Sequence, residues 1–252
     1  MVRYSKRVDL LCIRIPYLFF VAYLIILLLT KRPFATSSSW DADGTPSVTN
    51  DLYLWLQFVV FLFVLVITAF CFEEIFRKSS ADYIRACKPG VCQALLFRYL
   101  RLLGSLELVY LPCVAIAFYQ VNQSIRINEQ LFHQSAPRVN IWIPLVQCAV
   151  AMVFYVTVTL FFLMLLKSRI YLFMIFISYC AFEATVMPYL IGDWVLFRGA
   201  FTAPDFFHCF PHNIALMLLL SPIMLAAVLI YGAHFFGAKR VKNKKIKKNE
   251  YT

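Results

Sequence analysis

The chain has 252 residues, of which 62% are apolar and only 15% are charged, with a mean hydropathy of +0.75. Soluble domains are nearer half apolar and a quarter charged, so these values exclude an ordinary water-soluble domain. The 25 Phe and only 7 Gly exclude disordered and collagen-like chains. A net charge of +11 in so apolar a chain suggests segments that face anionic lipid headgroups, and no folded element for reading nucleic acid is evident. We therefore predict an all-α, multi-spanning membrane protein.

The N-terminal residues predict an amphipathic helix that lies at the membrane interface. Apolar side chains recur at helical spacing from Tyr4 to Ile15, while Arg3 and neighbouring basic residues lie near the other side, and Pro16 then interrupts the pattern. An ordinary basic flank of the first span is the alternative interpretation.

Six apolar segments are long enough to cross a hydrocarbon core of about 30 Å. They are too long and too uniformly apolar for the strands of a membrane barrel. The predicted transmembrane helices are Ile13–Thr30, Leu52–Phe72, Leu103–Val121, Ile141–Leu166, Ile170–Ile191 and Ile214–Phe236. Residues 1–238 then form a six-helix transmembrane domain, and residues 239–252 form a basic cytoplasmic tail.

The distribution of basic residues predicts the orientation. Of the 24 Lys and Arg residues, 18 lie in the N-terminus, the loops after the second and fourth spans, and the tail, whereas the opposite loops hold five. The excess of positive charge marks the cytoplasmic side. Both termini are therefore expected in the cytoplasm, and the cell membrane is the expected location. All four histidines (His133, His208, His212 and His234) are expected on or near the outer side.

The loop after the second span predicts a short helix with a mixed-charge face. Glu73, Glu74, Arg77 and Arg85 flank an apolar stripe formed by Ile75, Phe76 and Tyr83. Pro89 and Gly90 end the helix, and a second amphipathic stretch, Val91–Leu102, leads into the third span. The helix is suited to docking on a cytosolic protein, and a solvated connecting helix is the alternative.

This segment resembles the coupling region in the membrane subunit of ABC exporters of the type-2 permease class. The residues that match are Glu73, Glu74, Arg77, Pro89, Gly90, Leu95, Arg98 and Leu102. The resemblance implies a coupling helix that receives motion from an ATP-binding subunit, through Glu73, Glu74, Phe76, Arg77, Tyr83 and Arg85. The family usually has a glycine shortly after the acidic pair, and Ser79, Ser80 and Ala81 occupy that stretch here.

The loop Gly192–His212 before the last span is too apolar for a solvated loop. Its eight large apolar side chains would each cost roughly 1.5–3 kcal/mol if left in water rather than fully buried. A re-entrant hairpin, which the family resemblance also implies, would bury them. An aromatic belt at the lipid boundary is the alternative.

Two acidic residues within the spans are candidates for a translocation path. Glu107 lies four residues into the third span, and Glu183 lies roughly 20 Å deep in the fifth at 1.5 Å per residue. Intramembrane carboxyl groups commonly mark functional sites, although hydrogen bonding within the bundle would also retain them. The cysteines in apolar stretches, among them Cys71, Cys113 and Cys148, are expected to be small buried side chains, and no metal site is predicted.

The favoured function is therefore the permease subunit of an ATP-driven exporter, and not an enzyme. The chain has no phosphate-binding GxxxxGK[ST] loop, so ATP and Mg would be bound by a separate ABC ATP-binding subunit. A second permease, identical or similar, and anionic lipids at the basic tail are the other expected partners.

An intramembrane hydrolase is the alternative function. Glu73 and Glu74 approach the acidic signature of CAAX-type membrane proteases, but Lys78 stands where that signature has Arg. Histidines on the outer side could not share a metal with an acidic pair on the inner side. A channel is disfavoured because no span carries a polar stripe.

Overall fold

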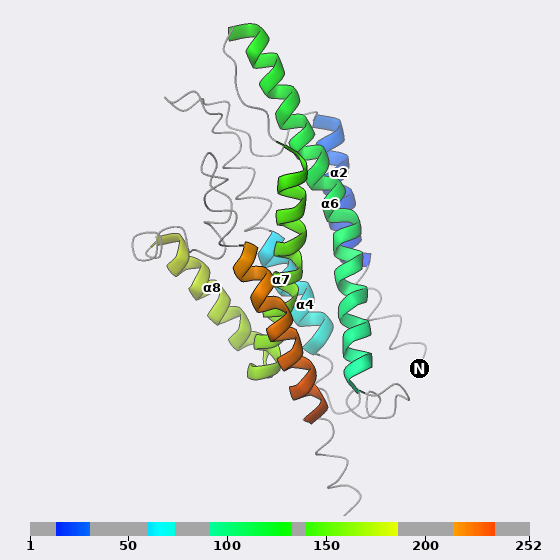
Figure 1. Cartoon of the computed structure of the whole chain (residues 1–252), viewed down its shortest axis with the longest axis vertical. Helices are drawn as coiled ribbons and strands as arrows, with labels where there is room; N and C mark the ends of the chain where they lie inside the picture. Colours follow the sequence, from blue (N-terminus) through cyan, green and yellow to red (C-terminus); the bar gives the residue numbers. More distant parts are fainter. Residues whose placement is uncertain (1–13, 31–59, 74–90, 133–139, 186–213, 235–252) are drawn as a thin grey trace, which may run out of the picture.

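A computed structural model describes residues 14–30, 60–73, 91–132, 140–185 and 214–234, and in these ranges the chain is almost entirely helical with no strand (Figure 1). Six helices make up this part of the structure. They are α2 (Ile15–Thr30), α4 (Val60–Glu73), α6 (Val91–Phe132), α7 (Trp142–Leu166), α8 (Arg169–Thr185) and a helix at Ile214–His234, called the 214–234 helix below. The expected all-α fold is confirmed for these residues.

Three of these helices are long and apolar enough to cross a membrane. They contain the segments Cys92–Ile127, Trp142–Leu166 and Ile214–His234, while α2, α4 and α8 contribute shorter apolar stretches. The apolar part of each long helix is apolar on most sides, because lipid and neighbouring helices can both accept apolar side chains. By composition and helix length, these three helices are candidate membrane spans.

Helix α6 is longer than the sequence pattern predicts. Its 42 residues rise about 63 Å at 1.5 Å per residue, twice the hydrocarbon core, and they join the expected Val91–Leu102 stretch and third span into one helix. The helix continues through Pro112, which removes one backbone donor, and passes the expected end of the span at Val121 to reach Phe132. Polar residues beyond Val121, such as Gln123 and Glu129, are good helix formers, so polarity ends the apolar run without ending the helix.

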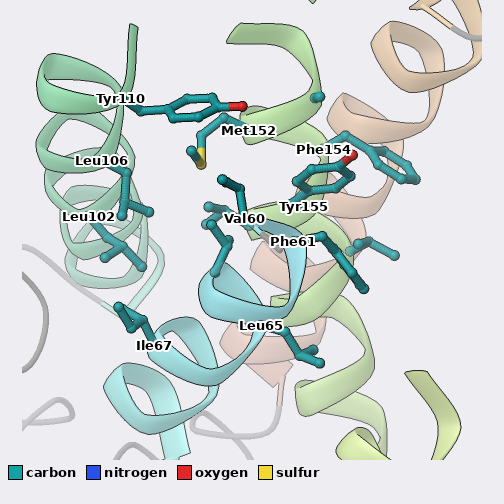
Figure 2. Packing of buried hydrophobic residues seen from close by; sticks show 14 of the residues in the cluster. Val60, Phe61, Leu65, Ile67, Leu102, Leu106, Tyr110, Met152, Phe154 and Tyr155 are labelled. Carbon is teal, nitrogen blue, oxygen red and sulfur yellow. The ribbon is translucent and has the colours of Figure 1, made fainter. Parts of the chain in front are cut away.

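Helix α7 lies at the centre of the bundle and contacts α4, α6 and α8. The ring of Phe61 on α4 lies 4.9 Å from Tyr155 on α7 and 5.5 Å from Phe176 on α8, measured between ring centroids. Figure 2 shows α4, α6 and α7 converging on this core, with Leu106 and Tyr110 of α6 on one side. These side chains are almost fully buried, so they form part of a close-packed core between α4, α6, α7 and α8.

Helix α2 packs against the middle of α6. The Phe20 ring lies 5.3 Å from Tyr110, and the Cys113 thiol donates a hydrogen bond to the Phe20 carbonyl oxygen at 3.4 Å. The 214–234 helix instead contacts α6 near Cys92 and Leu95. These two contact regions are about 27 Å apart along α6 at 1.5 Å per residue. The first and last expected spans are therefore staggered along the bundle.

Several predicted features lie outside the described residues. They are the interfacial N-terminal helix before Arg14, the expected coupling helix after Glu73, the hairpin at residues 192–212 and the basic tail at residues 239–252. These features stay predictions.

Candidate functional site at the basic end

Four basic residues from two different chain segments lie at one end of the bundle. Here α4 and α7 end, α6 and α8 begin, and the 214–234 helix ends (Figure 1). The four are Arg98 and Arg101 on α6, Lys167 directly after α7, and Arg169 at the start of α8. We call this region the basic end. It is also the end at which residues 74–90 connect α4 to α6.

Arg98 ties the start of α6 to the end of α4. Its guanidinium donates a hydrogen bond through Nη2 to the carbonyl oxygen of Cys71, and its Cζ lies 5.5 Å from the centroid of the Phe72 ring. The last carbonyls of a helix have no intrahelical partner, so a cation placed there both bonds them and balances the helix dipole. A hydrogen bond to a charged group contributes about 1.5–3 kcal/mol. Arg98 thus caps α4.

The neighbouring residue, Tyr99, ties α6 to α7. Its hydroxyl lies 2.7 Å from Thr157 Oγ1, and both side chains are buried. The Thr157 hydroxyl in turn donates to the carbonyl of Val153 at 2.7 Å. The Tyr99 hydroxyl therefore donates to Thr157 Oγ1, and both hydroxyl protons have an acceptor.

The 214–234 helix approaches α6 and α7 closely at Gly232. A Cβ atom at this position would lie only 2.7 Å from Leu95 Cδ1 and 3.5 Å from Met164 Cε. One turn before Leu95, the Cys92 thiol donates to the Leu229 carbonyl at 3.4 Å. Small residues allow helices in membranes to pack closely, and Gly232 serves this purpose here.

Lys167 and Arg169 flank the turn between α7 and α8. Lys167 adopts the left-handed conformation, with φ of 56°, and its N–H bonds the Leu163 carbonyl, which ends α7. Its ammonium lies 5.9 Å from the centroid of the Tyr231 ring. The Arg169 guanidinium lies 4.7 Å from the centroid of the Phe70 ring on α4. Both cations thus lie within cation–π range of a neighbouring helix.

The residues predicted for coupling or translocation are only partly described. Glu73 is the last residue of α4, and Glu183 lies in α8, but the structure does not describe their side chains. Glu107 is half-buried on α6. Of the other predicted coupling residues, Glu74, Phe76, Arg77, Tyr83 and Arg85 all lie outside the described residues.

The structure contradicts the expected separation of His234 from the acidic pair. His234 is the last residue of the 214–234 helix, three residues after Tyr231, which contacts Lys167 at the basic end. His234 therefore lies at the same end of the bundle as Glu73, the last residue of α4. One argument against a hydrolase is thereby removed. Across the described helices, however, no three His, Cys, Asp or Glu side chains come together as a metal site.

The cysteines follow the expectation with one exception. Cys113, Cys148 and Cys180 are free and buried, as expected for small apolar side chains, and Cys92 is free and exposed. Cys71 is disulfide-bonded, which corrects the expectation that it behaves as a free buried thiol. Cys71 is nevertheless buried, at 1% exposure, and it lies in the last turn of α4, beside the connecting segment.

Sequence reasoning noted Arg98 within the family pattern and missed Tyr99, Gly232 and the conformation of Lys167. A single glycine within an apolar span was the available signal for Gly232. No family model, curated protein or solved structure matches the chain.

Proposed function

We propose that this chain is the membrane subunit of an ATP-driven exporter, a transport subunit of the type-2 permease class and not an enzyme. In this proposal six helices cross the cell membrane, with both termini in the cytoplasm. A separate ABC subunit binds ATP and Mg, and a second permease completes the translocation path.

The observation that carries the proposal is the way in which the bundle holds both ends of residues 74–90. Arg98 bonds the last turn of α4 at Cys71, and the adjacent Tyr99 bonds Thr157 in the middle of α7. A force applied to the connecting segment would therefore reach α4, α6 and α7 together. Packed and hydrogen-bonded networks of this kind can carry coupling between distant sites.

The charges at the basic end support the proposed orientation. Arg98, Arg101, Lys167 and Arg169 gather at one end, as the excess of positive charge on the cytoplasmic side requires. Residues 74–90, which carry the proposed coupling helix, join the bundle at this same end. An ATPase in the cytoplasm would meet them there.

The test is assembly and coupling with the ATP-binding subunit. The full-length chain, expressed with ATPase genes from the same genome, should co-purify with one of them in mild detergent, and should not bind ATP when purified alone. A double variant, Phe76→Ala with Tyr83→Ala, should lose the ATPase, because helix-in-groove anchors commonly cost about 2 kcal/mol or more when truncated.

A matched control removes the same two ring types elsewhere. Tyr119 on α6 is 56% exposed and Phe182 on α8 is 43% exposed. The variant Tyr119→Ala with Phe182→Ala should keep the complex and its ATP turnover. Equal behaviour of the two double variants, or the absence of any co-purifying ATPase, would refute the proposal.

A further inference from the structure

Glu107 places a carboxyl group far from both ends of the longest candidate span. It lies near the middle of the segment Cys92–Ile127, about 22 Å and 30 Å along the helix from the two ends. Arg98, which bonds the end of α4, lies about 13 Å before it on the same helix. A glutamate side chain is too short to reach the interface from there, unlike the long side chains of lysine and arginine. Where α6 crosses a membrane, this carboxyl group lies at the depth of the acyl chains.

The side chain of Glu107 lies on the outward face of α6. Leu100, Gly104 and Glu107 recur at i, i+4 and i+7, which places them on one stripe of the helix. Leu100 is 54% exposed, Glu107 is half-buried, and a Cβ atom at Gly104 would meet nothing within 4 Å. Figure 2 shows Leu106 and Tyr110 of the opposite face turned toward the core. The carboxyl group therefore borders an apolar outer surface, with open space one turn away.

Nothing in the described part of the chain compensates a charge on Glu107. Among these residues, no cation and no hydrogen-bond donor contacts its carboxyl group. The hydroxyl of Tyr99 interacts with it electrostatically, but this hydroxyl is neutral and donates its hydrogen bond to Thr157 Oγ1. At neutral pH an ordinary glutamate holds its proton in about one molecule in 500. Transfer of an unpaired carboxylate into hydrocarbon is less favourable than that by many orders of magnitude, so the group binds a proton instead.

We propose that Glu107 is a proton-binding site within the membrane, a neutral carboxylic acid that faces the acyl chains and that hydrophobic carbodiimides modify. The carboxyl O–H adds across one C=N bond of the carbodiimide, so that its oxygen bonds to the carbon and its proton passes to a nitrogen. The acyl group then migrates to a nitrogen and gives a stable N-acylurea, without oxidation and without a leaving group. The site does not depend on the exporter proposal, because it requires only that α6 crosses a membrane.

The experiment compares two carbodiimides on the full-length protein in phosphatidylcholine liposomes at neutral pH. Dicyclohexylcarbodiimide dissolves in hydrocarbon, whereas ethyl-dimethylaminopropyl-carbodiimide is a water-soluble cation. Peptide mass spectrometry measures the modification of each carboxyl group. The hydrophobic reagent should modify Glu107 and the cationic reagent should not, because a cation does not enter hydrocarbon. Glu129 lies about 33 Å further along the same helix, beyond the apolar run, and its ratio of hydrophobic to water-soluble modification should be much lower.

Two variants test the protonation state independently of reagent access. Glu107→Gln replaces a neutral acid by a neutral amide of nearly the same shape, so it should abolish modification at this position and leave the melting temperature unchanged. Glu107→Asp keeps an acid at the same turn and should keep the preference for the hydrophobic reagent. If the Gln variant does not fold, the Asp variant and the comparison with Glu129 in wild type still decide the question.

Three outcomes overturn the proposal. Equal reagent ratios at Glu107 and Glu129 would show that the Glu107 carboxyl group lies in water. Protection of Glu107 from both reagents, removed only by denaturation in sodium dodecyl sulfate, would show that a protein contact encloses it. A melting temperature of Glu107→Gln several degrees below that of wild type would show that the wild-type carboxylate is ionised and paired with a cation.

Discussion

The contact at Gly232 predicts that two chemically identical substitutions will differ in their effect on stability. Gly232 and Gly104 are both helical glycines, on the 214–234 helix and on α6. A Cβ atom at Gly104 meets nothing within 4 Å, whereas at Gly232 it would lie 2.7 Å from Leu95 Cδ1. Gly→Ala raises helix propensity by a similar amount at both sites, so this contribution cancels when the variants are compared.

The size of the difference follows from the geometry. Carbon atoms reach their best separation at about 3.5–4.0 Å, so Leu95 would have to move by about 0.8 Å. Leu95 is only 2% exposed, and Met164 lies on the same side, so the side chain has little free space. Overpacking of this kind costs about 1–3 kcal/mol. We expect Gly232→Ala to be less stable than Gly104→Ala by that amount.

The measurement is thermal unfolding in detergent, followed by tryptophan fluorescence. A difference of 1 kcal/mol shifts the melting temperature by about 2–4 °C in a chain of this size, so the two variants should melt about 2–12 °C apart. A double-mutant cycle with Leu95→Ala tests the cause. Leu95→Ala alone should destabilise the protein by about 2–5 kcal/mol, and less in the Gly232→Ala background, where the new methyl group occupies part of the cavity. Equal melting temperatures, or strictly additive effects, would show that the close approach does not exist.

Three further predictions concern α6. Arg98→Met should lower the free energy of unfolding by about 1.5–3 kcal/mol because the end of α4 loses its cap, and Arg98→Lys should lower it by less. If the Met variant melts at the same temperature as wild type, Arg98 does not cap α4. Tyr99→Phe should cost only about 0.6 kcal/mol, since its partner hydroxyl on α7 keeps its own acceptor, so a melting temperature lowered by more than a few degrees would point to a different network. The last of the three tests whether α6 crosses the membrane. In a Cys92→Ser background, a membrane-impermeant maleimide should label Gln130→Cys in intact cells, and it should label Gln93→Cys only after permeabilisation. Labelling of both positions from one side would mean that α6 does not cross the membrane.

The sequence predicts the positions of the helices well wherever an apolar run ends at charged or turn residues. The fourth span was expected at Ile141–Leu166 and is observed as Trp142–Leu166, because Lys167 ends both the apolar run and the helix. The end of α6 was missed for the opposite reason, since good helix-forming polar residues follow Val121. Hydropathy locates the part of a helix that suits lipid, and it does not locate where backbone hydrogen bonding stops.

The contacts at the basic end could not be predicted in the same way. The bond from Arg98 to the Cys71 carbonyl joins two helices whose relative height no local pattern specifies. Gly232 is likewise understandable only once Leu95 is known to lie opposite. The error over His234 was avoidable, because the orientation assigned to the last span already places its final turn on the cytoplasmic side.

The first turns of α6 also indicate where the bilayer begins. Cys92, Leu95, Arg98 and Tyr99 lie on one face of the helix and contact α4, α7 and the 214–234 helix. On the other side, Phe97 is 68% exposed and Leu100 is 54% exposed. In water this arrangement would be unfavourable, with a cation turned inward and large apolar side chains turned outward. In lipid it is favourable, because the carbonyl of α4 compensates the cation and acyl chains accept Phe97 and Leu100. We therefore expect the hydrocarbon core to reach the first turns of α6, more than a turn before Leu103, where the apolar run of the sequence placed the start of the third span.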